Sequence, residues 1–188
     1  MVLRLVVLCG LPGAGKSSVG RLLERDSRQF RFWPEIGGLR HAEFGGYPWD
    51  KDPAFDQKIM DDEFERDQRL ANGQHIPIVE TWHFGNMAFA RIRSPSVFNS
   101  YGSRLTGTMD FFRPTMLLLD VPVPFSLERS RYPNNQVAKR FLEALQQNIS
   151  EIAAHYSVPS FTVDACRPST EVLEDCRQRI RDLHDLKP

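Results

Sequence analysis

Hydrophobic residues in this chain are concentrated in short runs, separated by longer stretches of mixed hydrophobic and polar residues. The runs at 3–9, 30–33, 76–80, 116–120 and 160–163 have the length and composition of β-strands. The first and fourth are almost wholly apolar, as expected for central strands covered on both faces. Strands that alternate with helical stretches predict an α/β fold, in which a five-stranded parallel sheet carries helices on both faces.

Three of the intervening stretches have the pattern of helices, at about 53–70, 136–156 and 169–186. Asn72-Gly73 is a common signal for the end of a helix, and Ser169 is the expected N-cap of the last helix. In the helix at 136–156, apolar residues recur every three or four positions and form one stripe: Val137, Phe141, Leu145, Ile149, Ile152 and Tyr156.

Two stretches fit neither pattern. Residues 36–50 are rich in glycine and aromatic residues, and residues 93–107 mix serine, glycine, proline and aromatic residues. Long loops are uncommon in compact domains, and they usually serve a functional site. We therefore interpret both stretches as loops that line a pocket for a substrate.

Composition narrows the classes of protein that remain. A length of 188 residues suits a single domain over 1–188. The 24 Lys and Arg balance 24 Asp and Glu, so nothing favours a nucleic acid or a membrane as partner. Three cysteines without metal-like spacing suit a reducing, cytoplasmic environment. The apolar run at 2–9 is too short to span a bilayer, which needs about 20 residues, and it lacks a signal-peptide cleavage site.

The segment Gly10-Leu-Pro-Gly-Ala-Gly-Lys16-Ser17 matches the pattern G-x-x-x-x-G-K-[ST], between a hydrophobic strand and a helical stretch. Glycines let the backbone wrap closely, so that N–H groups and the start of the next helix face phosphate oxygens. The Lys16 ammonium then contacts the β- and γ-phosphates, and the Ser17 hydroxyl binds magnesium. The pattern predicts ATP and Mg²⁺ as cofactors, held by Gly10, Pro12, Gly13, Ala14, Gly15, Lys16, Ser17 and Ser18.

Four further segments resemble the thymidylate kinase branch of the nucleoside and nucleotide kinases. They are Pro-Glu-Ile-Gly-Gly at 34–38, Glu-Thr-Trp at 80–82 with Ala88-Phe89, Leu-Asp-Val-Pro at 119–122 with Leu-Glu-Arg at 127–129, and Val-Asp-Ala-Cys-Arg-Pro at 163–168. The resemblance implies a P-loop NTPase fold with a short lid at about 129–136. It also implies ATP-dependent transfer of the γ-phosphate to a small-molecule nucleotide or nucleoside.

The chain departs from the family pattern at positions that handle phosphate. Thr81 stands where the family has an arginine, and the lid carries only Arg131 after Arg129. Arg66 and Arg69 are the candidates for binding an acceptor phosphate. These departures leave the acceptor open among thymidylate, a nucleoside, a modified nucleotide and an unrelated alcohol.

Carboxylates end two predicted strands, at the edge where open α/β sheets bind ligands. Glu35 is a candidate to accept the proton of an acceptor hydroxyl, or to hydrogen-bond the substrate. Glu80 is a candidate to hold magnesium through water, or to act as the base in place of Glu35. Asp120 is an alternative magnesium residue, or a turn carboxylate before Pro122, but Glu80 better matches the position that the resemblance implies.

Arginine and aromatic residues supply the other candidates. Arg129 and Arg131 would close over ATP, one by stacking on adenine and the other by neutralising charge on the transferred phosphoryl group. His83 has no second histidine at metal spacing, so we interpret it as a hydrogen-bonded loop residue. Five aromatic residues are candidates for a slot that holds a base: Tyr47, Trp49, Phe55, Trp82 and Phe84.

Two other functions remain open from the residues alone. One is a kinase that phosphorylates a hydroxyl on a modified base in DNA, or a small metabolite alcohol. The other is a regulatory P-loop NTPase, although the chain lacks an Asn-Lys-x-Asp signature for guanine. The neutral net charge argues against a DNA substrate, and a homodimer is left open.

Overall fold

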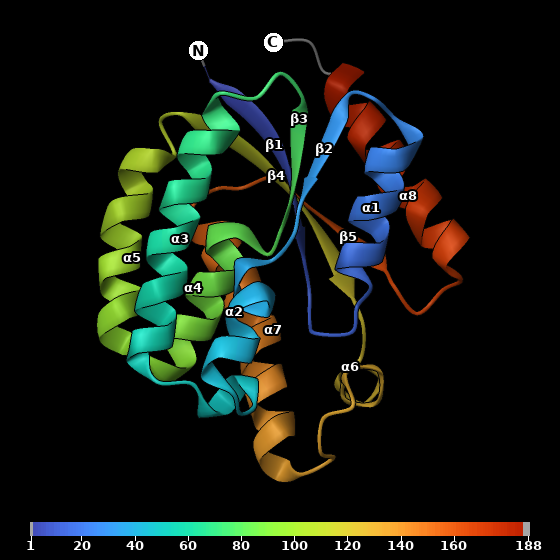
Figure 1. The fold of residues 1–188 in the computed structure, drawn as a ribbon. Helices are drawn as coiled ribbons and strands as arrows, with labels where there is room; N and C mark the ends of the chain where they lie inside the picture. The colour runs from blue at the N-terminus through green and yellow to red at the C-terminus, as the bar shows by residue number, and fades with distance from the viewer. Residues whose placement is uncertain (1, 186–188) are drawn as a thin grey trace.

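The computed structural model describes residues 2–185, and its centre is a five-stranded parallel sheet with the order β2-β3-β1-β4-β5. The strands are β1 (Leu3–Cys9), β2 (Phe30–Trp33), β3 (Ile76–Glu80), β4 (Phe112–Asp120) and β5 (Ser160–Asp164). Helices cover both faces, with α1 and α8 on one side and α3, α4, α5 and α7 on the other (Figure 1). The predicted α/β fold is confirmed.

The eight helices and one 3₁₀ turn of residues 2–185 connect these strands. They are α1 (Lys16–Asp26), α2 (Ile36–Phe44), η1 (Pro48–Asp50), α3 (Pro53–Ala71), α4 (Trp82–Arg93), α5 (Pro95–Thr108), α6 (Val123–Ser130), α7 (Gln136–His155) and α8 (Ser169–Asp185). None of the helices described is both long enough and apolar enough to cross a membrane.

The three predicted helices are confirmed, with small differences at their ends. Helix α3 ends at Ala71, one residue after the predicted 70, with Asn72 as its C-cap, and α7 ends one residue before the predicted 156. Ser169 is the first residue of α8 rather than the residue before it, and the predicted last residue, 186, lies outside the described residues. Shifts of one residue at a helix end are normal, because the terminal turns fray.

The two predicted loops are wrong, because both stretches are largely helical. Residues 36–50 form α2 and η1, and residues 93–107 lie mostly in α5. Pro95 occupies the first turn of α5, where its missing N–H costs nothing. Val97, Tyr101 and Leu105 then recur every four residues as a buried stripe, which the serines and glycines between them hide in the sequence.

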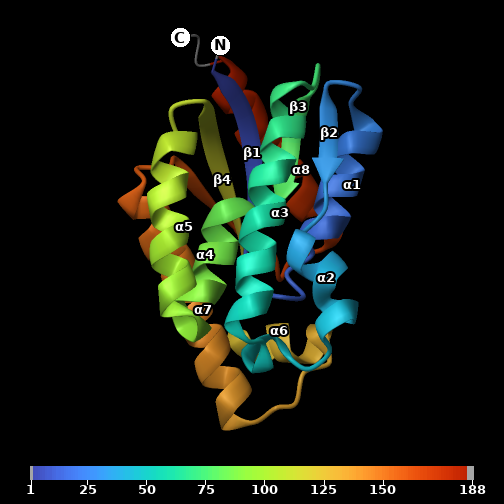
Figure 2. The same ribbon diagram turned by 60° about the vertical axis from the view of Figure 1, so that its left-hand side comes forward.

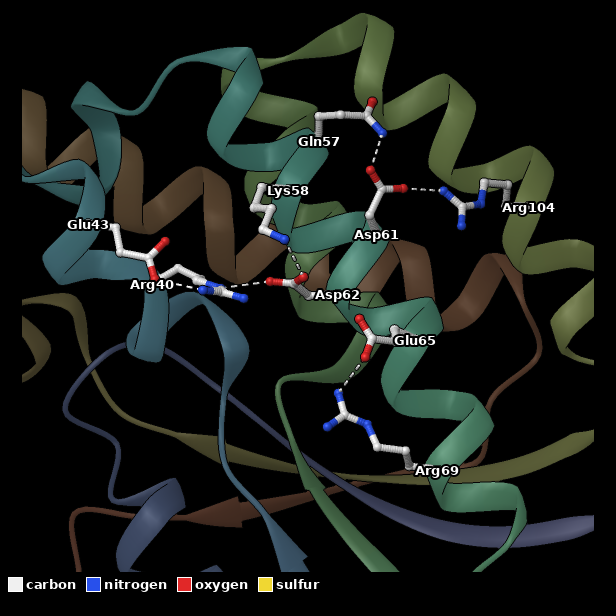
Figure 3. A network of polar contacts seen from close by, with 9 residues as sticks. All are labelled: Arg40, Glu43, Gln57, Lys58, Asp61, Asp62, Glu65, Arg69 and Arg104. Atoms are coloured by element: carbon white, nitrogen blue, oxygen red, sulfur yellow. Dashed lines mark hydrogen bonds and ion pairs between the residues drawn. The ribbon is translucent and has the colours of Figure 1, made fainter.

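Helix α2 is held against α3 by an apolar cluster of Ile36, Phe55 and Ile59. Ion pairs reinforce this packing on the surface, where the Arg40 Nε donates to the Asp62 Oδ2 at 2.8 Å (Figure 3). Partly exposed pairs of this kind are worth roughly 0–1 kcal/mol each, so the apolar contacts dominate. The packing places the N-terminal end of α2 at the end of the sheet where the strands terminate (Figure 2).

Candidate active site

The loop between β1 and α1 has the geometry that binds phosphate in other proteins. Gly13 and Gly15 adopt φ of 77° and 90°, a left-handed conformation that residues with a Cβ rarely adopt. A Cβ on Gly10 would collide with the carbonyl oxygen of Leu119, so the loop lies tightly against the end of β4. Helix α1 begins directly after it at Lys16, which directs the positive helix end toward the loop.

Lys16 and Ser17 are the first two residues of α1. The Lys16 side chain is 7% exposed, and its Nζ donates to the carbonyl oxygens of Gly10 at 3.1 Å and Leu11 at 3.2 Å. The Ser17 hydroxyl donates to the Glu80 carboxylate, 2.8 Å from Oε1 and 2.9 Å from Oε2. Strand pairing brings these residues together, because Leu8 of β1 is in register with Glu80 of β3.

The Ser17 hydroxyl and the Glu80 carboxylate fit Mg²⁺. This ion prefers oxygen ligands and usually binds one or two carboxylates together with substrate phosphates and water. No group of three or more His, Cys, Asp or Glu that could hold a metal exists among residues 2–185, so other ligands would come from the nucleotide and water. Asp120 fits less well, because its Oδ1 accepts a hydrogen bond from the Gln146 Nε2 at 2.6 Å.

Glu35 precedes α2 and faces the same region. Its backbone N–H donates to the Glu80 Oε2 at 3.4 Å, which fixes the two acidic residues relative to each other. Burial raises the pKa of the Glu35 carboxyl, the Lys16 ammonium acts in the opposite direction, and the Glu80 charge raises it further. A carboxylate with a raised pKa is a stronger base than an exposed one.

A cavity of about 280 Å³ adjoins Lys16 and Glu35. Residues 36–50 contribute Gly37, Gly38, His41 and Pro48 to its wall, whereas residues 93–107 contribute only Arg93. The prediction that residues 93–107 line the pocket as a loop is therefore wrong, since α5 packs against α3 and α4 instead. A larger cavity of about 450 Å³ lies around Arg4 and Phe112, at the opposite edge from the one where such sheets bind ligands.

The sequence did not single out several residues of the smaller cavity. Lys51 lies between η1 and α3, and Tyr132 lies in the lid segment. Asn86, Phe89 and Arg93 line the cavity from one face of α4. Their spacing of three and four residues places them on one face of a helix, but this pattern is informative only when residues 82–93 are known to be helical.

Two of the predicted aromatic residues do not reach the cavity. Trp82 and Phe84 are both 0% exposed and belong to the hydrophobic core, with their rings packed edge to face at 5.1 Å. The Trp82 Nε1 donates to the Asp67 Oδ1 at 2.9 Å. Thr81 and Trp82 have φ of 69° and 44°, an uncommon backbone turn that starts α4 with Trp82 directed inward. Phe55 does line the cavity.

Arg66 is a buried structural residue rather than part of the cavity wall. It is 3% exposed, forms an ion pair with Glu63, and donates from Nη1 to the Pro34 carbonyl at 3.1 Å. The prediction that it contacts substrate is wrong in this structure. Glu63 also accepts from the Asn86 Nδ2 at 2.9 Å, so the ion pair connects the cavity wall to the residue before Glu35.

His83 is hydrogen-bonded as predicted, but it lies in α4 and not in a loop. Its Nε2 is 2.7 Å from the Asp67 Oδ2, and its Nδ1 is 2.9 Å from the Tyr101 hydroxyl. The rings of His83 and Tyr101 are almost completely buried. These contacts explain His83 as a packing residue between α3, α4 and α5.

The segment at 129–136 joins α6 to α7 beside the phosphate loop. The Arg129 Nη1 donates to the carbonyl oxygens of Gly13 at 3.4 Å and Ala165 at 3.3 Å, so Arg129 is positioned next to the loop. Arg131 is exposed, and with φ of 56° it ends α6.

Tyr47 and Trp49 stack on each other, with ring centroids 4.8 Å apart, and both contact Tyr132 of the lid segment. The ring of Tyr132 packs edge-on against Trp49 at 5.4 Å and against Tyr47 at 6.2 Å. Tyr132 lines the cavity, whereas the other two rings do not. The predicted base slot therefore does not include Tyr47 and Trp49 directly.

The comparisons with known proteins give a fold but no family. No family model matches the chain, and no curated protein sequence matches it. Among solved structures, it is similar to deoxyadenosine kinase from M. mycoides with the products dCMP and a flexible dCDP bound, with a TM-score of 0.65, 13% identity, and coverage of 96% of this chain and 100% of that chain. The same enzyme with bound dATP gives a TM-score of 0.63, 15% identity, and coverage of 95% and 100%.

At these identities the similarity shows the fold alone. The chain has the α/β fold of these structures, and the phosphate loop, Glu35 and Glu80 lie together at the carboxyl edge of its sheet.

Proposed function

We propose that this chain is an ATP-dependent kinase that transfers the γ-phosphate to a nucleoside or nucleotide. The observation that carries the proposal is that Lys16 and Glu35 line one cavity, while hydrogen bonds connect Glu80 to Ser17 and to the Glu35 backbone. A phosphate loop alone is common to many classes of protein. A cavity next to that loop, with a half-buried carboxylate in its wall, supports transfer to a small acceptor rather than hydrolysis alone.

The residues of the phosphate loop, 10–18, would bind the ATP phosphates, with Lys16 on the β- and γ-phosphates. Ser17 and Glu80 would hold Mg²⁺, which neutralises charge on the transferred phosphoryl group when bound. Arg129, next to the loop carbonyl of Gly13, is placed to contact the nucleotide, and Arg131 would approach when the lid segment closes.

Glu35 would act on the acceptor. Its carboxylate would take the proton of an acceptor hydroxyl while the hydroxyl oxygen bonds to the γ-phosphorus and ADP leaves. The raised pKa of Glu35, caused mainly by its burial, supports this role because it strengthens the base. Two acceptors have support, because the sequence resemblance favours thymidylate and the structural similarity favours a deoxynucleoside.

A screen with γ-labelled ATP and Mg²⁺ tests the proposal, using nucleosides, their monophosphates, DNA oligonucleotides and small alcohols as acceptors. We expect label to move to a nucleoside or a nucleotide. Lys16→Ala should lower that transfer by roughly 10²-fold or more, the effect of removing a preorganised electrostatic contact. Slow hydrolysis of ATP without transfer to any acceptor would instead identify a regulatory NTPase.

A further inference from the structure

Lys51 is a buried cation without a partner in the wall of the cavity. Its side chain is 7% exposed, and its Nζ has no hydrogen-bond partner among residues 2–185. Its contact with the Phe55 ring is loose, with Nζ 5.2 Å from the ring centre. Burial lowers the pKa of Lys51, and the neighbouring Arg93 lowers it further.

The carboxylates near Lys51 are committed to other groups. Asp56 receives hydrogen bonds from Arg93, with Nη2 at 2.6 Å and Nε at 2.9 Å, and from the Ser94 hydroxyl at 2.6 Å. Asp52 caps α3 by accepting a hydrogen bond from the Phe55 N–H at 3.0 Å. Asp50 accepts one from the Tyr47 N–H at 3.2 Å. Neither Asp50 nor Asp52 forms an ion pair with Lys51 in the described part of the chain.

The charges in the cavity are therefore unbalanced at one point. Arg93 and Asp56 neutralise each other, whereas the Lys51 ammonium has no counter-ion among the residues that the structure describes. A buried charge without a partner lowers the stability of a fold, and a ligand that supplies the opposite charge removes that cost. Lysine donates three hydrogen bonds and suits the oxygens of a phosphate or a carboxylate.

Lys51 also lies away from the reacting end of the cavity. Its Nζ lies over the face of Phe55 in α3, as does the Arg93 guanidinium. The Lys16 Nζ is instead hydrogen-bonded to carbonyl oxygens of the phosphate loop. An anion at Lys51 would thus be a different group from the γ-phosphate and from the hydroxyl that receives it.

We propose that Lys51 binds an oxyanion of the acceptor, a phosphate or a carboxylate, at a position separate from the hydroxyl that is phosphorylated. The acceptor would then carry its own negative charge rather than being a neutral nucleoside. This inference rests on the proposed kinase function, since it names a feature of the acceptor in the same cavity.

Matched acceptors that differ by one anionic group test the proposal. Suitable sets are each nucleoside with its 3′- and 5′-monophosphates, and uridine with orotidine, which adds a carboxylate to the base. We expect the wild-type chain to use one anionic member with a KM about tenfold or more below that of its neutral partner, which corresponds to one charge-assisted contact. The member that is preferred distinguishes phosphate from carboxylate.

Substitution of Lys51 separates its role from a general effect on the fold. Lys51→Met keeps the length of the side chain, so we expect the KM of the anionic member to rise to that of its neutral partner. Lys51→Arg should keep the advantage. Lys58→Met is the matched control, because Lys58 is exposed on α3 and pairs with Asp62 outside the cavity. An equal effect of Lys51→Met on both members would overturn the proposal.

A binding measurement keeps this test independent of turnover. With MgADP saturating the phosphate loop, inorganic phosphate or acetate should raise the melting temperature of the wild type and of Lys58→Met, but not that of Lys51→Met, because ligands that bind the folded state stabilise it. The same rise in all three proteins would contradict an anion site at Lys51. Failure of transfer to every acceptor would instead remove the kinase function, whatever the binding result.

Discussion

Ser17 and Glu80, 63 residues apart in the sequence, are joined by a hydrogen bond of 2.8 Å between the serine hydroxyl and the carboxylate. One residue follows β1 and the other ends β3, so the contact depends on the pairing of two adjacent parallel strands. Any small shift in that pairing would separate the oxygens that fit magnesium. The hydrogen bond therefore links the register of the central strands to the chemistry of the site.

Glu80→Gln should lower phosphoryl transfer and shift its magnesium dependence to higher concentration. A neutral amide is a poorer partner than a carboxylate for a hard dication, so more metal is needed to fill the site. Magnesium titrations of the transfer rate measure the shift. Asp120→Asn is the control and should keep the wild-type curve, because Asp120 is held by Gln146. Superimposable curves for Glu80→Gln and the wild type would remove Glu80 from the metal site.

The fold could be predicted because its strands are encoded locally. Each of the five strands contains an apolar run, and the runs at 3–9, 30–33 and 76–80 match β1, β2 and β3 to the residue. Strand β4 begins earlier than predicted, at Phe112, since Arg113 and Pro114 interrupt the apolar pattern. These residues still pair with β1, which only the three-dimensional structure reveals.

The candidate site could be predicted only in part, for a similar reason. The phosphate loop is one continuous segment, so its residues are visible in the sequence. The cavity wall comes from five separate parts of the chain, and Lys51 and Arg93 join it through the packing of α2, α3 and α4. The sequence also does not predict that Trp82 lies in the core, because the positive φ values at Thr81 and Trp82 direct its ring inward.

The activity of the chain should decline at acidic pH because of Glu35. If this carboxylate accepts a proton, kcat falls as the pH drops through its pKa, which burial raises above the ordinary range. Glu35→Gln should cost about 10²–10⁴-fold in kcat and abolish this limb of the pH profile. Rate profiles from pH 4 to 9 measure both effects. A change in KM alone, with the acidic limb retained, would show that Glu35 only positions the acceptor.

Glu35 should also make the folded state less stable as the pH rises, whereas it makes the enzyme more active. Because folding raises the pKa of Glu35, the stability that this group contributes is full below its unfolded pKa of about 4.3 and is lost as the pH rises through the folded value. Glu35→Gln removes that loss, so the variant should be more stable than the wild type at neutral pH and not at pH 4. Denaturant unfolding at both pH values measures the difference. Glu65→Gln, at an exposed carboxylate, should show no such dependence.

Tyr132 should position the lid segment through its ring rather than its hydroxyl. Tyr132→Ala removes edge contacts with Tyr47 and Trp49, and aromatic pairs contribute about 0.5–1.5 kcal/mol each beyond their buried area. We expect the KM of the acceptor to rise about two- to tenfold and hydrogen exchange at 131–136 to become faster. Tyr132→Phe should behave as the wild type. An equal defect in both variants would assign the effect to the hydroxyl instead.

Arg66 provides a test that separates a structural role from a role in substrate binding. The resemblance to thymidylate kinases suggested a contact with an acceptor phosphate, but the buried guanidinium pairs with Glu63 and donates to the Pro34 carbonyl. Arg66→Met should therefore destabilise the fold by about 3–5 kcal/mol, because it leaves the Glu63 charge buried without its partner.

Adding Glu63→Gln to Arg66→Met should recover part of that stability, since it removes the uncompensated charge and keeps an oxygen for the Asn86 amide. Urea unfolding of the two single variants and the double variant measures this coupling. Kinetics of the folded fraction complete the test. Arg66→Met loses the hydrogen bond to Pro34, the residue that precedes Glu35. We therefore expect a larger loss in kcat than in acceptor affinity. If Arg66→Met unfolds like the wild type but has a raised acceptor KM, Arg66 binds the substrate. Its side chain would then have to leave the buried ion pair in the closed complex.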